Sequence, residues 1–271
     1  MKDVVAPIPH RPRVKLILKK YGDIIPAMDR DITDHCAEID RCNQRGGRML
    51  SIVDLMEAGT LNRDIAAYSL AAIGNGCSFM IGAMPGGAGK TTVMGALLNF
   101  VPCGVTLLPA DGIESVERGL ADTQRRCFIC HEIGSGPYYA YLWGEALRRY
   151  FRLPEAGHIL ATNLHADTFE QARRQVRDEN GVSSGAFRRM NLVYFLSVEG
   201  GFRRRRRVAS IWESNGKDEH RPVFGNGTDD PLSKSRIVTS DMFRSAGKVI
   251  DNVTRSGART IEEVRKTVIW A

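Results

Sequence analysis

A glycine-rich stretch between an apolar run and a helix-forming run places the strongest limit on what this chain of 271 residues can fold into. The apolar run, residues 78–83, predicts a buried strand, and residues 91–100 predict a helix. Between them lies Met84-Pro85-Gly86-Gly87-Ala88-Gly89-Lys90-Thr91-Thr92. A loop of small residues that ends in Gly-Lys-Thr, set between a strand and a helix, is typical of phosphate-binding loops. The sequence therefore predicts an α/β fold with an anion site at the start of the helix.

The residue types in this loop suit polyphosphate binding. Small residues let backbone N–H groups curl around a phosphate, and Lys90 is a mobile charge for the β- and γ-phosphates. The Thr91 hydroxyl can bind Mg²⁺, and Thr92 is expected near the α-phosphate. Met84 stands where the usual pattern has glycine, so Met84 fits only if its φ stays negative. The expected nucleotide-binding residues are Pro85, Gly86, Gly87, Ala88, Gly89, Lys90, Thr91 and Thr92.

Composition limits the class of protein. Hydrophobic residues make up 43% of the chain, which is enough to bury a full core. No run approaches the roughly 20 apolar residues of a membrane helix, and the N-terminus lacks the apolar core of a signal peptide. A net charge of +7 permits contact with nucleic acid or anionic lipid but requires neither. We therefore expect a cytoplasmic protein, docked at most peripherally on the inner face of a membrane.

The six cysteines do not predict a metal site. Only Cys127 and Cys130 are close in sequence, and a zinc site needs a second pair at matching spacing. In a strand, positions three apart point to opposite faces. The cysteines are therefore expected to be small buried side chains.

The order of apolar runs and turn signals predicts the domain organisation. Further strands are expected at 105–108, 127–130 and 158–161, with helices between several of them, which favours a mostly parallel sheet covered on both faces. Residues 191–199 and 204–212 predict an added antiparallel hairpin, and residues 221–224 a short third strand. We expect residues 1–50 to form a short, partly helical N-terminal region and residues 51–271 to form one phosphate-loop domain.

Three segments after the loop carry candidate catalytic residues. Val105-Thr106-Leu107-Leu108-Pro109-Ala110-Asp111-Gly112-Ile113-Glu114 ends in two acids, Asp111 and Glu114. Cys127-Phe128-Ile129-Cys130-His131-Glu132 is an apolar strand that leads to Glu132. Gly157-His158-Ile159-Leu160-Ala161-Thr162-Asn163-Leu164-His165-Ala166-Asp167-Thr168 carries His165 after a further apolar strand. A carboxylate at the end of a central strand can hold Mg²⁺ or orient an attacking water.

With the loop, these segments resemble the acidic box, the Walker B segment and the histidine box of the secretion-system, type IV pilus and archaeal surface-motor ATPases. The resemblance covers roughly residues 51–225 and implies a RecA-like P-loop domain. Ala110 stands where that family's acidic box has its first Glu, His131 replaces a small residue, and Asn163 stands where Thr is common. The full N-terminal domain that members usually carry is missing from residues 1–50.

The resemblance implies a hexameric motor that binds ATP or ADP with Mg²⁺ and converts ATP hydrolysis into subunit motion. Thr91 and Glu132 are the implied metal ligands, and a membrane platform protein of a secretion or pilus machine is the implied partner. In such hexamers, arginines between the first two boxes reach a neighbour's γ-phosphate, which makes Arg118, Arg125 and Arg126 candidates. The implied catalytic residues are Lys90, Asp111, Glu114, Glu132 and His165.

Two other functions remain open. Met84, Ala110 and the short N-terminal region favour a nucleotide-binding regulator or assembly protein with little turnover. A nucleic-acid translocase would need salt-sensitive binding of DNA or RNA. The run Arg203–Arg207 does not favour nucleic acid, because alternate residues of a strand point to opposite faces and cannot all meet one phosphate backbone.

Overall fold

The computed structural model describes residues 29–43, 46–200, 204–225, 230–231 and 233–270. Residues 1–28 of the expected N-terminal region, Gly201 and Arg203 lie outside the described residues. Residues 29–41 are helical. The strands are β1 (Phe79–Gly82), β2 (Thr106–Pro109), β3 (Arg126–Ile133), β4 (Tyr141–Leu142), β5 (Ile159–Leu164), β6 (Leu192–Glu199), β7 (Arg205–Glu213) and β8 (Arg221–Phe224). The helices are α2 (Ile52–Glu57), α3 (Arg63–Gly74), α4 (Lys90–Leu98), α5 (Ile113–Ala121), α6 (Gly144–Tyr150), α7 (Phe169–Arg173), α8 (Ser184–Arg188), α9 (Ser240–Arg255) and α10 (Ile261–Trp270), with a 3-10 turn at Leu153–Ala156 and a π-helical turn at Arg174–Glu179.

One sheet organises the chain, with the strand order β2-β3-β5-β1-β6-β7-β8 and β4 paired to the end of β3. The pairs from β2 through β6 are parallel, and the β6–β7 and β7–β8 pairs are antiparallel. The expected fold class is confirmed: a mostly parallel α/β sheet carries an added antiparallel hairpin. The short strand expected at residues 221–224 is present as β8. β5 separates β1 from β3, although β3 precedes β5 in the chain.

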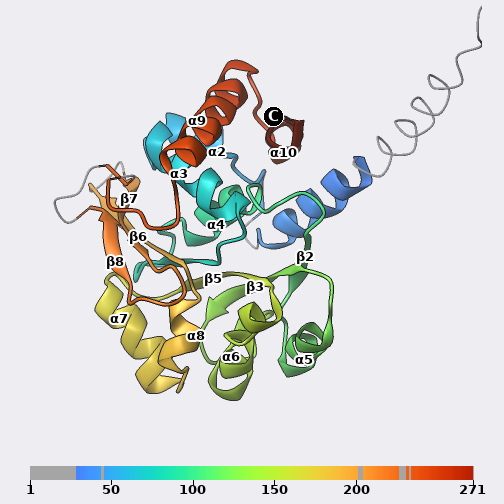
Figure 1. Cartoon of the computed structure of the whole chain (residues 1–271), viewed down its shortest axis with the longest axis vertical. Helices are drawn as coiled ribbons and strands as arrows, with labels where there is room; N and C mark the ends of the chain where they lie inside the picture. Colours follow the sequence, from blue (N-terminus) through green and yellow to red (C-terminus); the bar gives the residue numbers. More distant parts are fainter. Residues whose placement is uncertain (1–28, 44–45, 201–203, 226–229, 232, 271) are drawn as a thin grey trace, which may run out of the picture.

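Helices cover both faces of this sheet (Figure 1). One apolar cluster joins a face of the sheet to α2, α3, α4, α9 and α10, and a second joins the other face to α5, α6, α7 and α8. Cys127 belongs to the first cluster and Cys130 to the second, so the prediction that they face opposite ways is confirmed. Cys103, by contrast, is exposed. Among the described residues, no helix combines the length and apolar character needed to cross a membrane.

The helix at residues 29–41 packs onto the same core as the phosphate-loop helix. Its side chains Ile32, Cys36 and Ile39 are buried in the first apolar cluster. The buried His35 contacts the Leu98 carbonyl at the end of α4 through Nε2, at 3.0 Å. The division at residue 50 between an N-terminal region and a phosphate-loop domain stays a prediction.

Side-chain caps fix where several helices begin. Ser51 and Asp54 form a reciprocal capping box at the start of α2, and Asn62 caps α3 through the Ile65 N–H. Thr260 and Glu263 form the same box before α10. Each cap satisfies backbone N–H groups that the first helical turn leaves unpaired.

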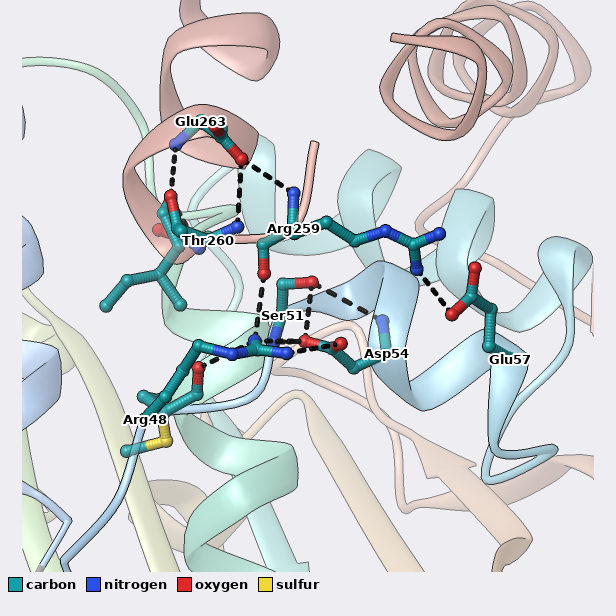
Figure 2. Close-up of polar contacts among 10 residues, drawn as sticks. Arg48, Ser51, Asp54, Glu57, Arg259, Thr260 and Glu263 are labelled. Atoms are coloured by element: carbon teal, nitrogen blue, oxygen red, sulfur yellow. Dashed lines mark hydrogen bonds and ion pairs between the residues drawn. The ribbon is translucent and has the colours of Figure 1, made fainter. Parts of the chain in front are cut away.

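A polar cluster ties α2 to the connection between α9 and α10 (Figure 2). Arg48 donates two hydrogen bonds, of 2.6 and 2.8 Å, to the Asp54 carboxylate and a third, of 2.9 Å, to the Arg259 carbonyl. Arg259 in turn pairs with Glu57. Exposed ion pairs each contribute little, but a bidentate fork with a backbone contact fixes geometry. The cluster thereby holds the segment between α9 and α10 against α2 and against Arg48, which precedes α2.

Candidate functional site

The glycine-rich loop follows β1 near the middle of the sheet, at the carboxyl ends of the parallel strands. Gly87 and Gly89 have φ values of +79° and +95°, a conformation that favours glycine. Met84 is not among the residues with positive φ, so it meets the requirement for a negative φ that the sequence analysis gave for this position. Its backbone N–H donates to Asp167 Oδ1 at 2.7 Å, which anchors the first residue of the loop to the end of β5.

Lys90 is the first residue of α4, and its ammonium group lies under the loop. The side chain is only 9% exposed. Nζ donates to the Ala83 carbonyl at 3.1 Å and lies 3.3 Å from His165 Nδ1 and 3.6 Å from Glu132 Oε2. A buried charge is stable only when it is paired and hydrogen-bonded, and here a carboxylate and a carbonyl meet that need. The loop, β3 and β5 therefore converge on one cation.

Glu132 reaches this cation from the end of β3. The β3–β5 pairing shifts register between Cys130 and Ile133, and such an irregularity re-aims the side chains within it. Oε2 faces Lys90, whereas the buried Oε1 makes no hydrogen bond to any described residue. Burial raises the pKa of Glu132 above its usual value, and the charges of Lys90 and His165 pull it in the other direction. A carboxylate with a raised pKa and an unused oxygen is suited to orient a water molecule or to accept a proton from it.

His165, directly after β5, completes the cluster. Its Nδ1 lies 3.1 Å from the Met84 carbonyl, and its Nε2 lies 3.9 Å from Glu132 Oε2. Nδ1 can donate to Met84 or accept from Lys90, but it cannot do both in one protonation state. The ring therefore has two alternative hydrogen-bond partners, Lys90 and the Met84 carbonyl.

The donor set fits a magnesium nucleotide. The backbone of Gly87 and Gly89 forms a cradle at the N-terminus of α4, where N–H groups and the helix dipole favour an anion. Thr91 lies in the first turn of α4, and the unused Oε1 of Glu132 supplies a hard oxygen for a cation or its bound water. Thr91 and Glu132 would hold Mg²⁺, which when bound would neutralise phosphate charge. Pro85, Gly86 and Ala88 lie in the loop and Thr92 lies in the first turn of α4; their contacts with a nucleotide stay predictions.

Asp111 and Glu114 do not join the Lys90–Glu132–His165 cluster in this structure. Both are exposed, and they follow β2, which is three strand spacings, or about 14 Å, from β1. The adjoining Ala110 is fully buried and donates its N–H to Ile129. A carboxylate at this position would be buried.

The arginines expected to act on a neighbouring subunit occupy a different part of the fold. Arg126 opens β3 and donates to Asp122 at 2.9 Å, and Arg125 donates to the Gly76 carbonyl at 3.2 Å. Arg125 and Arg126 lie at the amino-terminal end of β3, whereas Glu132 lies at its carboxyl end. Arg118 is exposed on α5. Their action on a second subunit stays a prediction.

The two histidines of the third segment have different surroundings. His158 is 3% exposed, accepts from the Arg126 N–H through Nδ1, and contacts the Gly119 carbonyl through Nε2. Both ring nitrogens are thus satisfied by backbone, which gives His158 a structural role.

Three polar residues at the site were missed by the sequence analysis: Asp167, Arg206 and Asn163, whose amide donates to the His131 carbonyl at 2.8 Å. Asp167 stands two residues after His165, but only the pairing of β5 with β1 shows its contact.

Solved structures that are similar to this chain include two ATPases. No protein-family model matches the chain, and no curated protein matches it. The VirB11 ATPase of the Brucella suis type IV secretion system is 16% identical, with a TM-score of 0.43 over 60% of this chain and 56% of that one. The ATPase DotB of Legionella pneumophila is 11% identical, with a TM-score of 0.44 over 83% of this chain and 67% of that one. Both names belong to the class of ATPases that the sequence resembles.

Proposed function

We propose that this protein binds ATP and ADP with Mg²⁺ and hydrolyses ATP as an oligomeric motor, with Lys90, Thr91 and Glu132 as its essential residues. The observation that carries the proposal is the 3.6 Å approach of Lys90 Nζ to Glu132 Oε2 beneath a glycine-rich loop. The loop and Lys90 would hold the phosphates, and Glu132 would orient the attacking water. His165 would report the state of the γ-phosphate to the sheet.

Steady-state hydrolysis of Mg-ATP tests this function over a range of protein concentrations. We expect turnover per chain to rise with concentration, because a motor of this kind completes its site in a homo-oligomer. Lys90→Ala should lose nucleotide binding, and Glu132→Gln should keep binding while turnover falls by about a hundredfold or more. The matched controls are Lys248→Ala and Glu155→Gln, which change exposed residues of the same types. Turnover that survives in Lys90→Ala would contradict the proposal.

A second function is a nucleotide-binding regulator or assembly protein. Met84 and Ala110, which replace a loop glycine and an acidic residue of the resembled family, favour it. Nucleotide binding that depends on Lys90, without turnover at any protein concentration, would support the regulator and exclude the motor.

The proposed partners follow from the motor. We propose a homo-oligomer, a hexamer by resemblance, that lies in the cytoplasm and docks on a membrane platform protein of a secretion or pilus machine. A nucleic-acid partner is not favoured, because Arg206 and Arg207 contact different segments, Gly87 and Glu199. ATP turnover stimulated by DNA or RNA, and lost at high salt, would instead favour a translocase.

A further inference from the structure

The side chain of Arg206 lies against the phosphate loop. Its Nε donates to the Gly87 carbonyl at 2.9 Å. A Cβ placed on Gly89 would lie 3.2 Å from Arg206 Cδ, so the alkyl part of the side chain passes over that glycine. Arg206 belongs to β7 and is separated from the loop by more than a hundred residues of sequence. The hairpin therefore brings a guanidinium to the rim of the anion cradle.

The alternation of β7 sets Arg206 apart from its neighbours. Arg206 pairs with Val198 across the hairpin, and Val208, two positions on, is buried in the core that contains α4. Arg207 points the other way and pairs with Glu199 at 3.3 Å. No carboxylate of the described residues lies within 4.0 Å of Arg206, and only Nε has a hydrogen-bond partner there. Arginine has five N–H donors, so the four on Nη1 and Nη2 remain for a ligand.

The charges of the site give these donors a role. The charge of Lys90 is balanced in part by Glu132, 3.6 Å away, so the cradle is less positive than a phosphate loop with an unpaired lysine. A nucleoside diphosphate or triphosphate carries several negative charges. Arginine binds phosphate with two parallel hydrogen bonds and always stays charged.

We propose that Arg206 is a phosphate-binding residue of this site, supplied by the β6–β7 hairpin of the same chain. The inference rests on the proposed nucleotide binding but does not require hydrolysis. Nε keeps the hairpin on the Gly87 carbonyl, and the Nη groups bind the polyphosphate of ATP or ADP. Phosphate binding thereby links the loop to the antiparallel edge of the sheet.

Equilibrium binding by calorimetry tests the proposal with four ligands: Mg-ATP, Mg-ADP, inorganic pyrophosphate and adenosine. The proteins are the wild type, Arg206→Ala, Arg206→Lys and the control Arg205→Ala, which removes the same charge from the next residue of β7. We expect Arg206→Ala to weaken ATP, ADP and pyrophosphate by roughly ten- to a hundredfold, with adenosine unchanged. Arg206→Lys should recover part of the loss, and Arg205→Ala should match the wild type. Thermal unfolding of each variant shows whether it remains folded.

The outcomes separate the two proposals. Equal affinities in wild type and Arg206→Ala, or equal losses in Arg205→Ala and Arg206→Ala, would overturn the role of Arg206. Binding that depends on Arg206 without ATP turnover would leave that role intact and overturn only the motor. A wild-type protein that binds none of the phosphate ligands would overturn both.

Discussion

The Asp167 carboxylate accepts the Met84 backbone N–H at 2.7 Å and so joins the segment that follows β5 to the first residue of the phosphate loop. The same short segment carries His165, whose ring contacts the Met84 carbonyl. Both polar groups of the Met84 backbone are therefore held by the end of the neighbouring strand. This anchor explains how the loop keeps its shape with methionine at a position where glycine is usual.

Removal of the anchor should weaken nucleotide binding. We expect Asp167→Ala to raise the Kd for ADP by about three- to tenfold, because one exposed hydrogen bond to a charged acceptor is lost. Asp167→Asn keeps an acceptor oxygen and should lose less. Calorimetric titration of both variants measures the effect, and an unchanged Kd in Asp167→Ala would show that the loop is held by other contacts.

Gly82, the last residue of β1, should not tolerate a side chain. A Cβ there would lie 2.7 Å from the Ala166 carbonyl oxygen and 2.7 Å from the Phe195 ring. We expect Gly82→Ala to lower the free energy of unfolding by about 1–3 kcal/mol, because neighbouring backbone must move. Gly185→Ala is the matched control: no atom lies within 4 Å of its Cβ, and α8 should gain helix propensity. Urea denaturation measures the free energy of unfolding of both variants, and equal values would contradict the close packing around Gly82.

Arg265 caps the end of the phosphate-loop helix from α10. It is 1% exposed and donates to the carbonyls of Asn99, at 2.9 Å, and of Val101. We expect Arg265→Met to lower the free energy of unfolding by about 3 kcal/mol, because buried carbonyls lose their donors. Arg255→Met, on the exposed side of α9, is the control and should change little in the same urea titration.

Acid should destabilise the fold through two buried histidines. Burial, aided by the charge of Arg265, lowers the pKa of His35 to about 3, and burial lowers the pKa of His220 to about 4. Unfolded histidines take up protons near pH 6.5, whereas these stay neutral in the fold. Their contribution to stability is thus complete above pH 6.5 and is lost as the pH falls from 6.5 toward 4. Each histidine contributes a slope of up to about 1.4 kcal/mol per pH unit in that range.

Urea titrations at pH 7.5, 6 and 5 measure this slope. His35→Gln keeps an N–H donor for the Leu98 carbonyl but cannot titrate, so it should make stability less dependent on pH. A slope equal to that of the wild type would show that His35 is protonated in the folded protein.

Local patterns predicted the features that depend on neighbouring residues in sequence. The phosphate loop is a continuous stretch between an apolar run and a helix-forming run, so it was predicted from the sequence. Apolar runs predicted β1 and β5 for the same reason.

Contacts between distant segments could not be predicted in this way. Asp167 meets Met84, and Arg206 meets Gly87, only because of the strand order, which no local pattern encodes. The same order places Asp111 away from Lys90. The sequence therefore named most candidate residues but could not show which of them meet.

The position of β5 between β1 and β3 has a consequence for a chain emerging from the ribosome. Lys90 and Glu132 are synthesised before β5, yet β1, which leads into the loop and Lys90, is held apart from β3, which carries Glu132, by the width of that later strand. A nascent chain that ends near residue 150 contains both residues but lacks the strand that fixes their spacing. Such non-local pairing forms slowly and late. Competence to bind nucleotide would therefore arise only after translation has passed β5, which keeps an unfinished chain from occupying its site.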